Sequence, residues 1–279
     1  MRALTMPRLS IVIVTYNSRA DVEACLHSLT RDRPGTEHEI VVVDNASADG
    51  TADVVRERWQ AVRVLDAGGN VGFAAGNNIG IRQTFGELVL LLNPDTMVPP
   101  GAIDSLVRVL DRDPGAAAVG PRLVDAEGRA ELSFGRMISP LAELRQKLLG
   151  TGHDRRVPGI SHYVERTTRR ARPVDWVSGA CLLVRRVDAE SVGLLDERYF
   201  MYAEDVDFCA ALRARGRRVL FTPDAEITHL RGRSAATARS VTDQAYRRSQ
   251  LTFYARHHPG LVPFLRGYLR LRGRLPPGS

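Results

Sequence analysis

The stretch Leu90-Leu91-Leu92-Asn93-Pro94-Asp95 ends an apolar run in a carboxylate. Pro94 cannot continue a hydrogen-bonded ladder, so the pattern predicts a buried strand that surfaces at its carboxyl end and presents Asp95 there. In open α/β sheets, ligands bind at that edge. A carboxylate so placed can hold a divalent ion against a diphosphate, because Mg²⁺ binds through one or two carboxylates and phosphate oxygens. Taken alone, however, Asp95 is better explained as a turn or helix-capping residue.

Other predicted strands also end in polar residues. The β-branched run 9–14 leads into Thr15-Tyr16-Asn17, and the run 39–43 leads into Asp44-Asn45. Helical segments follow both strands, and shorter strands are predicted at 62–65 and 218–221. Because strand and helix alternate along the chain, we predict βαβ units and a parallel, doubly wound sheet. The polar strand ends would then line one edge of that sheet.

Composition sets limits on the class of protein. The chain has 279 residues, a hydrophobic content of 44% and a formal net charge of +7, carried almost wholly by arginine because Lys147 is the only lysine. No recognised nucleic-acid module accompanies this charge, so nucleic acid is not expected as a partner. No apolar run is long enough for a spanning helix or a signal peptide. Cys25, Cys181 and Cys209 lack metal-like spacing and are expected to be reduced core residues of a cytoplasmic protein.

Basic residues concentrate in two later segments. The polar stretch 150–173 is expected to be a mobile loop or an acceptor-side insertion. From about Phe253 to Arg274, arginines alternate with large apolar residues. Such a basic amphipathic segment can lie on an anionic membrane, or it can pack on the domain with a solvated arginine face, and the two readings have equal weight.

Seven short motifs give a more specific indication: Thr15-Tyr16-Asn17, Asp44-Asn45, Asn70-Val71-Gly72-Phe73, Asn93-Pro94-Asp95, Ser178-Gly179-Ala180, Glu204-Asp205 and His229. In this order they resemble family 2 glycosyltransferases of the GT-A fold, and within them bacterial rhamnosyltransferases that act on lipid-linked or cell-wall glycans. The match runs from Leu9 to about Leu230. The resemblance implies an α/β, GT-A-type fold with a Rossmann-like, mostly parallel sheet. We expect one catalytic domain over 1–240, with a donor half to 121 and an acceptor half from 122, and a helical tail over 241–279.

For the donor half, the resemblance implies contacts to a dTDP- or UDP-linked sugar from Thr15, Tyr16, Asn17, Asp44, Asn45, Asn70, Asn77, Asn93 and Asp95. Asp44 can accept a hydrogen bond from the imide N–H of a pyrimidine base, because a carboxylate is an acceptor only. The simpler alternative for Asp44-Asn45 is a polar turn that leads into a helix cap. The glycine-rich segment 68–78 is not a dinucleotide fingerprint, since it lacks the spacing and does not follow the first strand.

The resemblance assigns Asp205 as the catalytic base and Glu204 as a neighbour that binds or orients the acceptor. A transfer to a hydroxyl needs one base, and a single in-line displacement inverts the configuration without a covalent intermediate. The alternative is that both acids form the acidic first turn of a helix, which its dipole favours. Ser178 and Gly179 are expected to contact a sugar, while stacking of Trp176 on that sugar is weighed equally against a core position.

Asp95 resembles the last acid of the family's Asp-x-Asp metal motif, and Asn93 replaces the first acid. His229 is the second predicted ligand, although a lone histidine is more often structural. A divalent cofactor, Mg²⁺ or Mn²⁺, is therefore expected, and imidazole suits Mn²⁺ better. A homodimer is a further expectation.

Together these observations predict an inverting glycosyltransferase that moves a sugar, foremost rhamnose, to a hydroxyl of a glycan or polyprenyl-linked acceptor. Its expected place is the cytoplasm, with peripheral contact to the inner membrane face through the tail. Two alternatives remain. A sugar-phosphate nucleotidyltransferase would carry a glycine-rich, lysine-containing phosphate loop that the N-terminal region lacks. An inactive nucleotide-sugar-binding protein would not need Asp95, Asp205 and His229.

Overall fold

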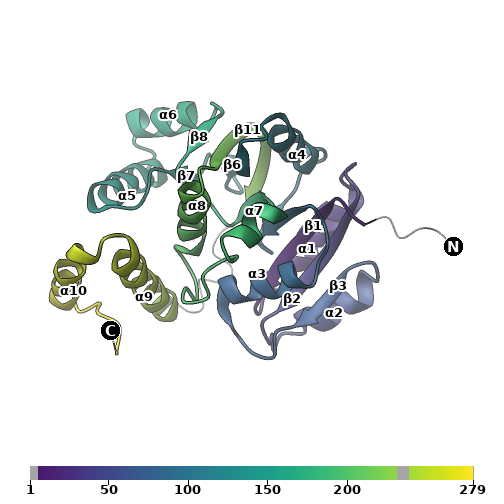
Figure 1. Ribbon diagram of the computed structural model, residues 1–279, viewed down its shortest axis with the longest axis horizontal. Helices are drawn as coiled ribbons and strands as arrows, with labels where there is room; N and C mark the ends of the chain where they lie inside the picture. The colour runs from purple at the N-terminus through teal and green to yellow at the C-terminus, as the bar shows by residue number, and fades with distance from the viewer. Residues whose placement is uncertain (1–5, 231–238, 279) are drawn as a thin grey trace.

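A computed structural model describes residues 6–230 and 239–278 of the chain, with side chains from residue 243 onward in the second range. Within these residues the centre is a nine-stranded sheet in the order β3-β2-β1-β4-β10-β6-β11-β5, with β8 paired to β11 (Figure 1). Its strands are β1 (Leu9–Thr15), β2 (His38–Asp44), β3 (Arg63–Asp66), β4 (Leu88–Leu92), β5 (Thr96–Met97), β6 (Ala116–Val124), β8 (Arg172–Val174), β10 (Cys181–Arg185) and β11 (Arg218–His229). A small second sheet pairs β7 (Phe134–Gly135) with β9 (Trp176–Val177).

The sheet is mostly parallel, as predicted. Strands β3, β2, β1, β4, β6 and β11 run in one direction, because β10 pairs antiparallel with both β4 and β6. Every residue of β1 and β4 is buried. Helices cover both faces of a parallel sheet, so its strands read as continuous apolar runs. The apolar run before Asp95 is accordingly the buried strand β4.

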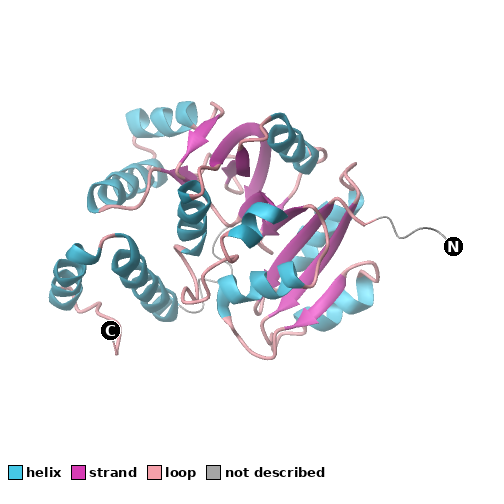
Figure 2. Cartoon of the chain, viewed as in Figure 1, coloured by secondary structure: helices cyan, strands magenta, loops and turns pink. Residues whose placement is uncertain are grey.

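Helices lie on both faces of the sheet (Figure 2). One core cluster joins it to α1 (Arg19–Arg31), α2 (Thr51–Arg58) and α4 (Ala102–Arg112). The other joins it to α3 (Gly72–Arg82), α7 (Arg186–Ser191), α8 (Glu204–Ala214) and α9 (Arg239–His257). Gly80 lets α3 approach closely, since a Cβ there would collide with the side chain of Val12 on β1. The glycine therefore packs the helix against the sheet.

The polar segment expected as a loop is largely helical. It falls within α5 (Pro140–Asp154) and α6 (Pro158–Thr167), which form a separate layer beside β7 and β8 (Figure 1). Prolines at the first helical positions and the hydroxyl of Ser139, which accepts from the Ala142 N–H at 3.3 Å, fix the helix starts. The expectation of a loop was wrong, because arginine is compatible with a helix and these start signals outweigh the segment's polarity.

The C-terminal region is helical, as predicted, but its first helix belongs to the core. Phe253 on α9 is fully buried, and the buried Asp207 of α8 pairs with Arg256 at 2.8 Å and with His257 at 2.6 Å. The 3₁₀ turn η1 (Pro259–Leu261) then leads to α10 (Val262–Leu271). The predicted tail from 241 therefore includes part of a helix that packs into the core, and its exposed apolar residues Phe264, Tyr268 and Leu271 lie on α10. Residues 231–238, at the end of the predicted acceptor half, lie outside the described residues.

No helix in the described part of the chain is long and apolar enough to cross a membrane.

Candidate functional site

The sheet topology gathers the predicted residues along one edge. Thr15 and Asp44 are paired at the carboxyl ends of β1 and β2, and the backbone N–H of Asn93 donates to Ala180 O just before β10. His229, at the end of β11, pairs with Thr96, the residue after Asp95. Residues more than a hundred positions apart thus meet where parallel strands end, which is where open α/β sheets bind ligands.

His229 lies between two carboxylates. Its Nε2 is 3.3 Å from Asp95 Oδ1, and its Nδ1 is 3.2 Å from Glu131 Oε2. Burial alone would lower the pKa of the imidazole, but hydrogen bonds to Asp95 and Glu131 outweigh it and raise the pKa of His229 to about 9. Without a metal, the protonated Nε2 therefore donates to Asp95; once that proton is released, the carboxylate and the imidazole nitrogen are a donor pair that suits Mn²⁺. The site could thus hold the metal that the sequence predicts.

Glu131 was not found from the sequence. It follows β6 after a hairpin turn, and its side chain is 6% exposed. A carboxylate on the far nitrogen of a metal-binding histidine commonly fixes the tautomer and orientation of the ring. No spacing in the sequence links Glu131 to His229, so only the folded chain reveals the pair.

The predicted catalytic acids stand at the N-terminus of α8. Asp205 is half-buried, and its two oxygens accept backbone N–H groups at 2.8 Å each, from Gly179 and from Val206. Burial raises the pKa of Asp205 despite these two hydrogen bonds. The Gly179 N–H thereby orients this carboxylate. Whether Gly179 also touches a sugar stays a prediction.

Glu204 has a different environment from Asp205. Its side chain is buried, and its Oε2 has no hydrogen-bond partner among the described residues. Burial and the neighbouring charge of Asp205 raise the pKa of Glu204 well above its usual range. The pair therefore favours a single negative charge, and Asp205 holds it because two N–H donors stabilise its carboxylate.

The backbone is strained around this edge. Of the six non-glycine residues with positive φ in the described ranges, four lie beside predicted site residues: Asn17, Ala46, Tyr202 and Ala203. Tyr202 and Ala203 have φ of 72° and 65° and directly precede Glu204. Left-handed backbone costs energy in non-glycine residues and concentrates at functional sites. The strain here presents the two acids at the start of α8.

On the donor side, Thr15 Oγ1 donates to Asp44 Oδ1 at 3.1 Å, and the other Asp44 oxygen accepts the Ser47 N–H at 2.9 Å. Asp44 is only 4% exposed, whereas Tyr16 is 47% exposed. Asn17 Oδ1 accepts the Ala48 N–H at 2.8 Å. This network ties the ends of β1 and β2 together and leaves the Tyr16 ring as the accessible surface.

The other four predicted asparagines divide into two groups. Asn45 and Asn77 are 3% and 1% exposed, and their amides donate to Gly72 O at 3.2 Å and Phe73 O at 2.9 Å. Asn77 lies on α3 with its side chain turned inward, and its predicted nucleotide contact stays a prediction. Asn70 is exposed and Asn93 is half-buried at the sheet edge, so both remain available.

Trp176 also lies in the core. It is 8% exposed, and its indole N–H donates to Arg136 O at 2.9 Å. The alternative of a core aromatic was right, and the predicted stacking on a sugar was wrong, since almost no ring face is accessible. Ser178 accepts the Ala180 N–H through its hydroxyl at 3.2 Å and shapes the turn that places Gly179 under Asp205.

The cysteines are free and buried, as expected. Burial raises the pKa of Cys25 to about 12, so its thiol stays protonated at neutral pH.

A twisted, mostly parallel sheet with a carboxylate–imidazole pair and a buried carboxylate at one edge defines an α/β group-transfer enzyme, and solved structures identify its architecture as GT-A. A Pyrobaculum calidifontis mannosyltransferase in complex with GDP-mannose and Mn²⁺ has a TM-score of 0.62 at 20% identity, covering 94% of this chain and 69% of that one. The Staphylococcus aureus protein TarS, residues 1–349 with UDP, has a TM-score of 0.57 at 18% identity, covering 88% and 65%.

The chain belongs to glycosyl transferase family 2, whose model matches residues 10–176. It is 35% identical to the N-acetylglucosaminyl-diphospho-decaprenol L-rhamnosyltransferase of Mycobacterium tuberculosis, across 96% of this chain and 92% of that protein. It is also 25% identical to the rhamnosyltransferase WbbL of Escherichia coli, across 78% and 82%. The predicted enzyme class, a glycosyltransferase, is confirmed.

Proposed function

We propose that this protein transfers L-rhamnose from a dTDP- or UDP-linked donor to a hydroxyl of a polyprenyl-diphosphate-linked sugar, with inversion at the anomeric carbon. The transfer chemistry rests on one observation, the carboxylate of Asp205 held by two backbone N–H groups at the sheet edge that also carries Asp95 and His229. The sugar and the acceptor class come from the near full-length relative in Mycobacterium tuberculosis.

Donor binding falls to the ends of β1, β2 and β4. The exposed Tyr16 ring offers a face to the base, and Asn70 and Asn93 supply amide groups to ribose or diphosphate. Thr15 and Asp44, joined at 3.1 Å, fix the two strand ends on which this surface depends. Asn17 and Asn45 act in the same way, since their side chains are engaged with backbone groups.

Asp205 supplies the base. Its carboxylate accepts the hydrogen bond of the acceptor hydroxyl and takes the proton as that oxygen attacks the anomeric carbon. The new carbon–oxygen bond forms as the bond to the nucleoside diphosphate breaks on the opposite side, so one displacement inverts the configuration. Neutral Glu204, next to Asp205, can donate a hydrogen bond to the acceptor or to the developing charge. The raised pKa of Asp205 suits a base, because a basicity nearer to neutral pH increases the driving force for proton transfer.

Asp95 and His229 are the proposed metal ligands, with Asp95 Oδ1 and His229 Nε2 as donor atoms. When bound, a divalent cation neutralises the diphosphate and makes it a better leaving group. Glu131 holds the far nitrogen of His229 at 3.2 Å and keeps the ring directed at Asp95.

We further propose that α10 contacts the cytoplasmic face of the membrane. Phe264, Tyr268 and Leu271 are 75%, 54% and 89% exposed, and Arg266 and Arg270 are exposed on the same helix. Exposed large apolar residues next to arginines favour an anionic lipid surface. The predicted homodimer stays a prediction.

The test is a donor panel of dTDP-rhamnose, UDP-N-acetylglucosamine and GDP-mannose with N-acetylglucosaminyl-diphospho-farnesol as acceptor. We expect nucleotide release that needs Mn²⁺ or Mg²⁺ and is fastest with dTDP-rhamnose, and a product whose anomeric configuration, measured by NMR, is inverted. Asp95→Ala should abolish the metal-assisted binding of the nucleotide, because Asn93 cannot replace the missing acid. Retention of configuration, or no transfer from any of the three donors by the wild type, would refute the proposal.

A further inference from the structure

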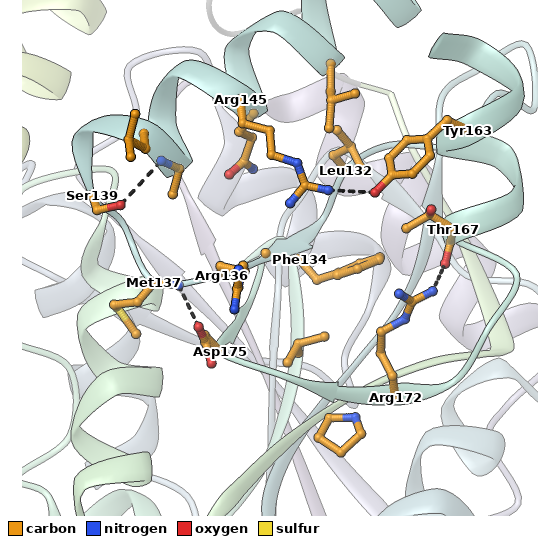
Figure 3. Close-up of a pocket in the computed structure, with 17 residues that line it drawn as sticks. Leu132, Phe134, Arg136, Met137, Ser139, Arg145, Tyr163, Thr167, Arg172 and Asp175 are labelled. Carbon is orange, nitrogen blue, oxygen red and sulfur yellow. Dashed lines mark hydrogen bonds between the residues drawn. The ribbon is translucent and has the colours of Figure 1, made fainter. Parts of the chain in front are cut away.

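A second feature lies beside the catalytic edge. A cavity of about 840 Å³ opens between the α5–α6 layer and strands β7 and β8 (Figure 3). Three arginines reach its walls, Arg136 after β7, Arg145 on α5 and Arg172 on β8. No sequence motif indicated this cavity, because its walls come from separate segments of the stretch 132–175.

The cavity carries excess positive charge. Its one acidic lining residue, Asp175, is already paired, since it lies 2.8 Å from Arg213 and also accepts the Met137 N–H at 2.8 Å. None of the three arginines has a carboxylate partner among the described residues. Three guanidinium groups around one space attract an anion with several oxygens, because arginine forms paired hydrogen bonds to phosphate.

Arg145 and Arg172 are held in place by contacts, and all three arginines keep N–H donors free. Arg172 donates to Thr167 O at 2.5 Å and lies over the Phe134 ring at 5.6 Å. Arg145 uses one N–H for Tyr163 Oη at 2.6 Å and retains four others. The side chain of Arg136 has no hydrogen bond to any residue that the structure describes. Figure 3 shows Arg145 and Arg172 extending from opposite walls, which suits an anion bound between them.

Apolar residues also line the cavity, and on α5 they continue onto an exposed surface. Leu141 lines the cavity and is 80% exposed, and Leu144 and Leu148 on the same helix are 55% and 60% exposed. Exposed leucines at helical spacing are unusual on a surface that meets only water. An anion pocket that adjoins an apolar ridge fits a ligand with an anionic head and a hydrocarbon chain.

The cavity also lies within reach of the catalytic base. Asp175 lines the cavity, and Gly179 contacts Asp205 at 2.8 Å. The four Cα–Cα steps from Asp175 to Gly179 span at most about 14 Å when fully extended. One sugar ring and a diphosphate can bridge a gap of that order, so a ligand could place its sugar at Asp205 and its phosphates in the cavity.

We propose that this cavity binds the diphosphate of the polyprenyl-linked acceptor, with Arg136 and Arg145 as phosphate donors and the apolar ridge of α5 receiving the first prenyl units. This inference rests on the proposed function, because it assigns the acceptor subsite of the same reaction. Arg172 forms the fixed wall of the subsite.

The test is isothermal titration calorimetry of the full chain with inorganic pyrophosphate, isopentenyl diphosphate and farnesyl diphosphate. EDTA is present throughout, so that no diphosphate binds through a metal at Asp95. Affinity should rise along this series. Arg136→Gln and Arg145→Gln should each lower the affinity for farnesyl diphosphate by about tenfold or more, which is the usual loss when a hydrogen bond to a charged group is removed. Arg166→Gln on α6 is the matched control, because it removes an exposed arginine outside the cavity.

In transfer assays, both cavity variants should raise the KM for the lipid-linked acceptor and leave kcat and donor affinity near wild type. Unchanged farnesyl diphosphate affinity in both variants would overturn the proposal, as would pyrophosphate binding as tightly as farnesyl diphosphate. In either case transfer by the wild type would leave the proposed function standing. If the wild type transfers no sugar, the proposed function fails whatever the cavity binds.

Discussion

Replacing Asp205 by asparagine should have two effects that can be measured separately: the loss of the catalytic base and the loss of one structural hydrogen bond. The two side chains have the same shape, but asparagine has one acceptor oxygen where aspartate has two. Both oxygens of Asp205 accept backbone N–H groups at 2.8 Å. Either amide orientation therefore turns an NH₂ group toward the N–H of Gly179 or Val206, and one backbone donor loses its partner.

The structural cost follows from that lost hydrogen bond. An unsatisfied buried donor costs about 1–3 kcal/mol. For a chain of this size the melting temperature should fall by a few degrees, at roughly 2–4 °C per kcal/mol. The catalytic cost is larger, because general-base catalysis contributes about 10²–10⁴-fold. We expect kcat to fall by that factor while donor affinity stays within about twofold, since the donor surface lies on β1, β2 and β4.

The assay is nucleotide release with saturating donor and metal, together with calorimetric donor affinity and a thermal melt of each variant. Glu204→Gln is the comparison, because it changes the adjacent acid without removing an acceptor from Gly179 or Val206. A loss in kcat below tenfold for Asp205→Asn, with a larger loss for Glu204→Gln, would assign the base to Glu204. An equal fall in donor affinity and kcat would show that the substitution disrupts the edge and not the proton transfer.

Three further predictions follow from the contacts. The pKa of Glu204 is raised in the folded state, so its stabilising contribution is complete below its usual pKa near 4.5 and is lost as the pH rises through the raised value. Glu204→Gln should therefore raise the melting temperature at pH 7, by an amount that shrinks toward pH 4. A gain in melting temperature that does not depend on pH would refute this. Glu131→Gln should weaken Mn²⁺ binding, measured by electron paramagnetic resonance, by about 10–100-fold, whereas an unchanged affinity would leave Glu131 a purely structural partner of His229. Deletion of 262–279 should abolish sedimentation with anionic vesicles at low salt, and high salt should do the same for the full chain; equal binding by both proteins would exclude α10 as the membrane contact.

The sequence by itself determined the strands, the polar strand ends and the order of the motifs. A buried parallel strand is apolar throughout, so the apolar run 88–92 predicts a buried strand. The polar residues that follow it mark the carboxyl edge of the sheet. Thr15, Asp44 and Asp95 were found in this way, because each stands where an apolar run ends, whereas Asp205 and His229 were assigned through the resemblance to family 2 glycosyltransferases. The helical C-terminal region was also predicted, from the spacing of its arginines and large apolar residues.

The tertiary structure decided which residues face the edge and which support it. Asn77 and Trp176 carry polar groups that suit a ligand, yet packing turns both inward, and local sequence does not encode the direction in which a helix or a short strand meets its neighbours. Glu131, Arg136 and Arg145 gave no sequence signal, because no spacing links them to the residues that they meet in the fold, whereas Arg172 belongs to the basic stretch 150–173 noted in the sequence. Contacts between distant residues depend on sheet order, and in this chain that order places β10 between β4 and β6.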